Sequence, residues 1–321
     1  MAKHMKKEDK KGKAGRVITT IILLICIGAC AVSGYFIYDY LHERHQNDVE
    51  YKQLKGKSYE DILKKNKDVV GWIEMEGTKI SYPVMWTPKD GEYYLHRNMD
   101  KEYSISGALF VDERCNAYQG NHLIIFGHHM SDGTMFGELC NYSSDKFYKK
   151  HKTFKYTFID KEGVGTTYVY RVFSYFKTET YAKPDYMEYA ALASPDKFKE
   201  YIDFVKKKSE KDIDITPKWG DDLITLSTCS YHVARPYGRY VVVAVKDSEI
   251  KPEVEKIVHK SKDANYLDII LDNQLYMMIA IAAGSVIGII ILIALIKALL
   301  RMRKENDDDD EDDDDTEVQQ V

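Results

Sequence analysis

The chain has 321 residues and a formal net charge of −5. That sign comes from the 11 acidic residues between Glu305 and Glu317, because +6 remains when they are set aside. Residues 39–273 hold 35 basic and 38 acidic side chains, a balance that argues against a nucleic-acid-binding surface, and they suffice for one domain with a hydrophobic core.

The first predicted element is a membrane-spanning helix over residues 17–38. This stretch carries no charged residue until Asp39, and about 20 apolar helical residues cross a bilayer core of about 30 Å. A cleaved signal peptide is the alternative, since Ile27-Gly28-Ala29-Cys30 looks like a lipoprotein processing site. A signal peptide's apolar region is usually about 7 to 15 residues long, so the length favours a retained anchor.

Residues 39–68 predict a helical lead-in to the domain. The segment is charged, with apolar residues at helical spacing, and Ser58 followed by Asp61 is typical of a helix start with a serine cap. From Val69 the pattern changes to short runs rich in β-branched and aromatic residues, broken by turn residues. These runs predict strands at 72–75, 80–85, 107–111, 122–126 and 166–176.

One helix interrupts the predicted strands. Ser194 followed by Pro195 is typical of a capped helix start, and Phe198, Tyr201 and Val205 continue at amphipathic spacing. Two further strands are predicted at 223–229 and 239–245. Many short strands with few helices indicate a barrel or a sandwich, so the fold class is mainly β.

The second long apolar run, 276–300, contains one charge, Lys297, near its end. It predicts a second membrane-spanning helix. Basic residues precede the first run and follow the second, and such residues favour the cytoplasm. Both termini are therefore predicted to be cytoplasmic, with the domain between the helices outside. The acidic segment Asp307–Asp315 repels itself and predicts a disordered tail.

Three side chains at strand ends suggest nucleophilic catalysis. Cys229 ends one predicted strand, Arg239 begins the next, and His128 follows a third. If the strands joined by the nine residues 230–238 pair antiparallel, the cysteine and the arginine lie close together. A thiol of ordinary pKa, about 8.5, needs such a cation to become a thiolate. The arginine can also hold an oxyanion, and the histidine can protonate a leaving amine.

Other readings of the same residues exist. A strand-end cysteine is often a small buried hydrophobe. A metal site could use Cys229, His232 and His128-His129, but no second ligand pair completes the set. Three cysteines lie between the apolar runs, and Cys115 and Cys140 could form a disulfide that leaves Cys229 free, although the sequence does not decide this.

Two motifs resemble those of a known family. Thr225-Leu226-Ser227-Thr228-Cys229 and Phe126-Gly127-His128-His129-Met130 are similar to motifs of the sortases, membrane-anchored cysteine transpeptidases of Gram-positive bacteria, and most closely of class B. The resemblance covers about residues 45–248. It implies an eight-stranded β-barrel with N-terminal helices and a helix between strands 6 and 7, here flanked by two transmembrane helices.

The resemblance also implies roles for individual residues. Cys229 would be the nucleophile, His128 rather than His129 the acid/base, and Arg239 rather than Arg235 the catalytic arginine. Ser227 and Thr228 would bind substrate, and no cofactor or metal would be needed. These residues would make the chain an enzyme of the thiol-peptidase type.

The implied reaction cleaves a C-terminal sorting signal through a thioacyl-enzyme and transfers the protein to an amine. Partners would be secreted surface proteins or pilins, a cell-wall precursor or a pilin lysine, and the membrane, with no nucleic acid. Two alternatives are a cysteine hydrolase without transfer and a non-catalytic envelope protein. A second, C-terminal membrane helix is more common in class C pilin polymerases, yet the chain lacks their Asp-Pro-aromatic lid.

The predicted organisation runs from a basic cytoplasmic N-terminus to an acidic cytoplasmic tail. In order, the segments are 1–16, the transmembrane helix 17–38, the extracellular lead-in 39–68, the catalytic barrel 69–248, a juxtamembrane linker 249–275, the transmembrane helix 276–300 and the tail 301–321.

Overall fold

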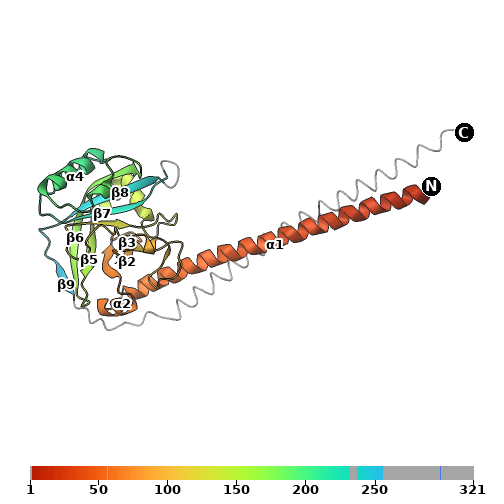
Figure 1. Ribbon diagram of the computed structural model, residues 1–321, viewed down its shortest axis with the longest axis horizontal. Helices are drawn as coiled ribbons and strands as arrows, with labels where there is room; N and C mark the ends of the chain where they lie inside the picture. Colours follow the sequence, from red (N-terminus) through yellow and green to blue (C-terminus); the bar gives the residue numbers. More distant parts are fainter. Residues whose placement is uncertain (1, 56, 232–236, 256–296, 298–321) are drawn as a thin grey trace. The chain divides into compact units, whose positions relative to one another are not determined.

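The computed structural model describes residues 2–55, 57–231, 237–255 and residue 297 (Figure 1). The chain divides into two compact units, Met1–His42 with Asn265–Val321, and Glu43–Ala264. The predicted second membrane helix and the acidic tail lie outside the described residues, apart from Lys297.

Helix α1 (Ala2–Leu54) supplies the described part of the first unit. Its segment Thr19–Asp39 has 21 residues with a mean hydropathy of 2.3, which is long and apolar enough to cross a membrane. Large apolar side chains on it are exposed, including Leu24 and Phe36. Among the described residues this is the one candidate span, and it is consistent with membrane anchoring.

The lead-in to the second unit follows the sequence prediction. Helix α2 (Tyr59–Lys65) begins at the Ser58 cap, whose Oγ accepts a hydrogen bond from the Asp61 amide at 3.2 Å. Tyr51 and Leu54, at the end of α1, are buried in the hydrophobic core of this unit. The helical lead-in is thus attached to the domain by apolar burial and not by its cap alone.

The second unit is a closed, mainly antiparallel β-barrel, as expected. Eight strands follow the order β5-β1-β2-β3-β4-β7-β8-β6, and β5 pairs with β6 to close the ring. The ninth strand, β9, pairs with β6 and was not predicted; β5 was also missed. The strands are β1 (Val69–Glu74), β2 (Ser81–Met85), β3 (Leu109–Val111), β4 (His122–Phe126), β5 (Thr153–Ile159), β6 (Gly165–Glu179), β7 (Leu223–Cys229), β8 (Gly238–Lys246) and β9 (Glu253–Glu255).

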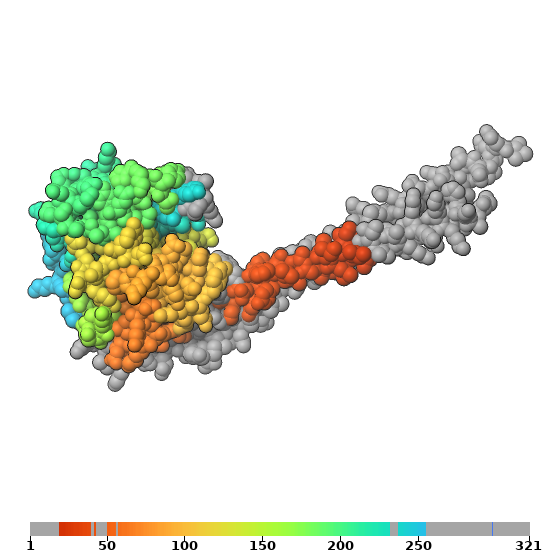
Figure 2. Space-filling view, viewed as in Figure 1, coloured from red at the N-terminus to blue at the C-terminus, as the bar shows by residue number. Residues whose placement is uncertain are grey.

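Short helices occupy the connections between the strands. Helix α4 (Pro195–Lys208) lies between β6 and β7 in the chain, as predicted, with Ser194 as its cap. Its region, green in Figure 2, forms one side of the unit's surface. The others are η1 (Tyr93–His96), η2 (Gly137–Ser143), α3 (Asp145–Lys150) and η3 (Tyr186–Tyr189).

Helix α4 and η3 cover the outer face of β7 through polar contacts. The Tyr201 hydroxyl in α4 lies 2.6 Å from Thr225 Oγ1, and His122 Nε2 in β4 lies 2.8 Å from the same atom. His122 Nδ1 is 2.8 Å from the Tyr189 carbonyl, and burial lowers the pKa of His122 to about 4. The ring is therefore neutral near pH 7, so its two contacts need no counter-ion.

The strand order brings three strand ends to one rim of the barrel. Strand β4 is parallel to β7, and β7 is antiparallel to β8. The C-terminal ends of β4 and β7 therefore lie beside the N-terminal start of β8. This rim carries the residues singled out from the sequence.

Candidate active site

Cys229 and Arg239 face each other across two neighbouring strands. They form the last register pair of β7 and β8, and the Ser230 amide donates to the Gly238 carbonyl at 3.0 Å just beyond it. Side chains of directly opposed residues lie on the same face, with Cβ atoms about 4.5–5.5 Å apart. Both side chains are half-buried. The structure thus confirms the expected antiparallel pairing, which places the two residues opposite each other.

His128 reaches the same rim because the main chain continues from β4 along β7. The Gly127 amide donates to the Ser227 carbonyl at 3.1 Å, and Thr228 Oγ1 donates to the Gly127 carbonyl at 2.8 Å. A Cβ atom at position 127 would lie 2.3 Å from Leu109 Cδ2, so only glycine fits this passage. The two bonds fix the backbone directly before the histidine.

The His128 ring is oriented by a main-chain carbonyl. Its Nε2 lies 2.8 Å from the Leu95 oxygen in η1. A carbonyl only accepts hydrogen bonds, so Nε2 carries the proton, and in the neutral ring Nδ1 holds the lone pair. Burial lowers the pKa of His128, as does the neighbouring His96, while the Leu95 contact partly offsets both. The ring centroids of the two histidines are 5.5 Å apart.

Cys229, His128 and Arg239 line one groove with a volume of about 400 Å³. Its walls come from chain segments far apart in sequence, which include the end of β3, the η1 loop and Met187 of η3. The other lining residues are Gly91, Glu92, Leu95, Phe110, Asp112, Glu113, Arg114, Phe126, Gly127, Ser227 and Thr228. A nucleophile, an imidazole and a guanidinium thus share a concavity that mixes apolar and polar side chains, as ligand sites do.

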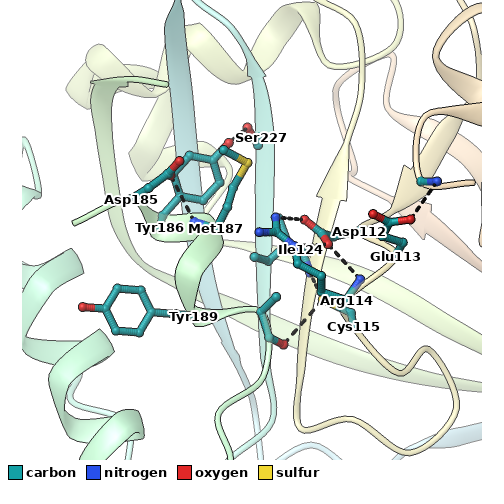
Figure 3. A network of polar contacts seen from close by, with 12 residues as sticks. Asp112, Glu113, Arg114, Cys115, Ile124, Asp185, Tyr186, Met187, Tyr189 and Ser227 are labelled. Atoms are coloured by element: carbon teal, nitrogen blue, oxygen red, sulfur yellow. Dashed lines mark hydrogen bonds and ion pairs between the residues drawn. The ribbon is translucent and has the colours of Figure 1, made fainter. Parts of the chain in front are cut away.

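One wall of the groove is stiffened by polar contacts after β3 (Figure 3). Arg114 binds the buried Asp112 with both carboxylate oxygens engaged, at 2.8 Å from Nε and 2.5 Å from a terminal nitrogen. Glu113 accepts a hydrogen bond from the Gly91 amide at 3.2 Å, which ties the wall to the η1 loop. A bidentate pair restricts both side chains and so fixes the shape of this wall.

The two predicted substrate-binding residues line the groove but are almost fully buried. Ser227 is 1% exposed and Thr228 is 2% exposed. Ser227 Oγ lies 2.7 Å from the Tyr186 hydroxyl of η3, visible in Figure 3, and Thr228 Oγ1 is committed to the Gly127 carbonyl. Tyr186 was not singled out from the sequence. Both hydroxyls therefore hold the groove's framework together.

The other cysteines outside α1 are poor nucleophiles. Cys115 and Cys140 are free thiols here, so the disulfide left open by the sequence is not formed. Burial raises the pKa of Cys115 to about 12 and that of Cys140 to about 11. Both remain protonated near neutral pH. Among the cysteines of the barrel that the structure describes, Cys229 is the one in the groove.

His129 has a different environment from His128. Its Nδ1 lies 2.9 Å from the Cys229 carbonyl oxygen and 3.3 Å from Cys140 Sγ, and it does not line the groove. Within residues 2–55, 57–231 and 237–255, no cluster of three or more His, Cys, Asp or Glu is placed to hold a metal ion. His232, which the metal hypothesis required, lies outside those ranges.

Comparisons with known proteins agree with this geometry. A sequence model of the sortase domain matches residues 73–247, more than half of the chain. Sortase B of Staphylococcus aureus is 33% identical over 242 residues, covering 70% of this chain and 95% of that protein. Sortase B of Listeria monocytogenes is 29% identical over 248 residues, covering 72% and 96%.

Solved structures show the same relationship. A Staphylococcus aureus sortase B–substrate complex has a TM-score of 0.52 and 29% identity, covering 66% of this chain and 96% of that one. A Bacillus anthracis sortase B in complex with AAEK1 has a TM-score of 0.54 and 29% identity, covering 65% and 98%. The chain belongs to the sortase family. Within that family it is a class B sortase, and its activity is that of a sortase transpeptidase.

Proposed function

We propose that Cys229 is the nucleophile of this transpeptidase, with His128 as acid/base and Arg239 as the oxyanion or peptide ligand. The observation that carries the proposal is the register pair of Cys229 and Arg239 in the groove that also contains His128. The arginine opposite the thiol is placed to hold the negative oxygen that forms when the sulfur attacks a carbonyl. The two raised thiol pKa values, of Cys115 and Cys140, add support by elimination.

The proposed reaction has two steps. The Cys229 thiol passes its proton to His128, and the sulfur then attacks the carbonyl carbon of a peptide bond, so that a C–S bond forms as the C–N bond breaks. The leaving nitrogen takes a proton from His128, which gives a thioacyl-enzyme. An incoming amine then attacks the thioester carbonyl, returns its proton to His128 and releases the thiolate. Arg239 holds the negative oxygen that develops in each step.

The substrates fit the family and the groove. We infer that the peptide bond cleaved lies in the C-terminal sorting signal of a secreted surface protein or a pilin, and is of the Thr–Gly or Thr–Asn type. The acceptor amine belongs to a cell-wall precursor or a pilin lysine. The mixed lining of the groove suits an extended peptide, and one structural relative is a sortase B–substrate complex.

The membrane arrangement is proposed from the sequence and the one described span. The segment Thr19–Asp39 anchors the chain, and the run 276–300 crosses the membrane a second time. Basic flanks on both runs support cytoplasmic termini and an extracellular barrel. Labelling of single engineered cysteines with a membrane-impermeant reagent, in a background without exposed thiols, tests this topology. Labelling of the tail in intact cells contradicts it.

The nucleophile is tested with the full-length chain in detergent, a panel of sorting-signal peptides and an added amine. The unsubstituted enzyme is expected to form a thioacyl adduct and a transfer product, detected by mass spectrometry. Cys229→Ala removes the sulfur and should form neither. Cys115→Ala is the matched control and should keep both. Turnover by Cys229→Ala at the rate of the unsubstituted enzyme would refute the proposal.

The partners of the thiol are tested in the same assay. His128→Ala and Arg239→Ala are each expected to lower kcat/KM by on the order of 10²- to 10³-fold, because each removes a group that stabilises the transition state. Arg171→Ala, an ion-paired arginine in β6 outside the groove, is the control for loss of a guanidinium. A loss of less than about tenfold in either groove variant assigns its role to another residue.

A further inference from the structure

The main-chain carbonyl of Cys229 is contacted by side chains on the side away from the groove. His129 Nδ1 lies 2.9 Å from this oxygen, and Cys140 Sγ lies 3.9 Å from it. His129 is itself held in place. Its backbone forms an antiparallel bridge with Met135, and its ring centroid lies 5.0 Å from that of Tyr231. These contacts hold the His129 ring with its Nδ1 toward the carbonyl of Cys229.

This contact occurs where the parallel pairing of β4 and β7 ends. The last register pair is Phe126 with Ser227, and the Gly127 amide extends the pairing to the Ser227 carbonyl. The next carbonyl on that side of β7 belongs to Cys229, two residues farther on. The Gly127 carbonyl is used by Thr228 Oγ1, so the regular ladder does not continue here. The His129 ring nitrogen occupies the place of the next ladder donor.

The chemistry of the contact fixes its direction. A carbonyl oxygen has no proton to give, so Nδ1 of His129 must be the donor. The Cys140 sulfur, 3.3 Å from the same nitrogen, then cannot donate to it, and at 3.9 Å from the Cys229 carbonyl it adds only a weak contact. His129 is therefore the main side-chain donor to this oxygen. Restraint of that oxygen restrains the Cys229 peptide plane, and with it the direction in which the thiol enters the groove.

We propose that His129 is a positioning residue for the transpeptidase reaction: its Nδ1–H holds the carbonyl of Cys229 and so aligns the nucleophile with His128 and Arg239. This rests on the proposed role of Cys229. In this role His129 acts through the Cys229 backbone, and not through contact with the substrate or with the Cys229 sulfur. Its effect belongs to the chemical step, because a misplacement of about 1 Å in a reacting group can cost about 10²-fold in rate.

The test uses two substitutions of the same shape. In His129→Asn the amide Nδ2–H lies the same number of bonds from the backbone as the imidazole Nδ1–H and can donate to the carbonyl. His129→Asp has the same outline but offers only acceptor oxygens when ionised. We expect kcat of the full-length His129→Asn enzyme within about threefold of the unsubstituted value, and kcat of His129→Asp lowered by on the order of 10²-fold, with KM changed much less in both.

Three outcomes overturn the proposal: equal kcat for the two variants, a loss confined to KM, or a loss that simply follows a lowered melting temperature. Cys140→Ala is the control, since it removes the neighbouring sulfur and leaves the His129 donor in place. It should change kcat by less than about threefold, because a thiol is a weak donor.

A measurement on the unsubstituted chain keeps the test decisive if a variant does not fold. With ¹⁵N-labelled histidine and ¹³C-carbonyl-labelled cysteine, His129 should show a protonated Nδ1 near neutral pH, coupled to the Cys229 carbonyl. A proton on Nε2 alone contradicts the proposal. The outcomes also separate the two hypotheses. Activity in Cys229→Ala removes the proposed nucleophile, whereas an inactive Cys229→Ala beside a fully active His129→Asp removes only the positioning role.

Discussion

At the scale of single residues, the two adjacent histidines differ in which ring nitrogen carries the proton, and this difference suits the two roles proposed for them. The Leu95 carbonyl requires a proton on Nε2 of His128, and the Cys229 carbonyl requires one on Nδ1 of His129. His128 therefore presents an unprotonated Nδ1 when neutral, which is what an acid/base group needs. His129 presents a donor to the backbone. The carbonyl oxygen that each ring contacts thus determines which of its nitrogens carries the proton.

The pKa of His128 gives a prediction about pH. Burial and His96 both lower it below the usual 6.5, so the acidic limb of the pH profile of kcat/KM should lie below pH 6.5. His96→Gln removes a nearby positive charge and should raise the pKa of His128, which moves this limb to higher pH. His96→Arg keeps a permanent charge there and should move it to lower pH. The measurement is kcat/KM between about pH 4 and pH 9 with one sorting peptide.

A limb that stays in place in both His96 variants would show that another group controls it. A shift in the same direction in both would show that His96 acts through packing and not through its charge. His96 is exposed, so neither substitution should disturb the fold.

The sequence singled out three residues that the structure places in one groove, but not their supporting contacts. Cys229, His128 and Arg239 stood out because they are chemically complementary and lie at strand boundaries of one domain. The contacts from Leu95 and to the Cys229 carbonyl use main-chain oxygens, which every residue possesses and which no sequence pattern marks. Tyr186, whose hydroxyl meets Ser227, is one of 25 tyrosines, and only the packing of η3 distinguishes it.

At the scale of elements, the position of His128 depends on the tight passage from β4 into the following loop. Gly127 lies against Leu109 and Phe136, where a Cβ atom would approach their side chains to 2.3 and 2.6 Å. The Gly127 amide donates to the Ser227 carbonyl of β7, and the Gly127 carbonyl accepts from the Thr228 hydroxyl. Any shift of this peptide moves the histidine relative to the cysteine.

Gly127→Ala should therefore lower both stability and activity. Overpacking of a tight interior typically costs about 1–3 kcal/mol, and the displaced backbone should reduce kcat by on the order of 10²-fold. Gly28→Ala in α1 is the control, since a Cβ atom there meets nothing within 4 Å. Melting temperature and kcat are measured on both full-length variants. An alanine variant at position 127 with unchanged kcat contradicts the role of this passage.

Helices and strands predicted from the sequence were confirmed where their buried residues recur at helical or strand spacing. The capped helix α4 shows the apolar spacing that its buried Phe198, Tyr201 and Val205 require. Strand β5 was missed although Phe154 and Tyr156 are buried and Thr153 and Lys155 are exposed, an alternation that the sequence does contain. Strand β9 could not be found this way. Its single apolar residue, Val254, is 66% exposed and leaves no hydrophobic signal.

At the scale of the whole molecule, the pairing of strands far apart in the chain brings the three groove residues to one rim. The parallel neighbours β4 and β7 are not consecutive in the chain, and the long connection between them includes β5, β6 and α4. A hairpin of neighbouring strands could pair the cysteine with the arginine, but only the parallel pairing of β4 with β7 adds the histidine. Local sequence patterns predict that Cys229 and Arg239 are paired, whereas the position of His128 depends on how distant strands are arranged.

The short strand β9 has a consequence for the solubility of the protein. It pairs with Gly165–Thr167 at the start of β6, whereas β8 pairs with that strand only from Tyr170 onward. Without β9, these residues would present unsatisfied amides and carbonyls to other chains, and such edges promote aggregation.

Val254→Pro should release β9, because proline cannot donate to a strand partner and fits poorly inside a strand. Light scattering during heating should then begin at a lower temperature than for Val254→Thr, which keeps the strand. Equal onset in both variants contradicts this role. The three residues of β9 would then keep the enzyme soluble by leaving other chains no open strand edge with which to pair.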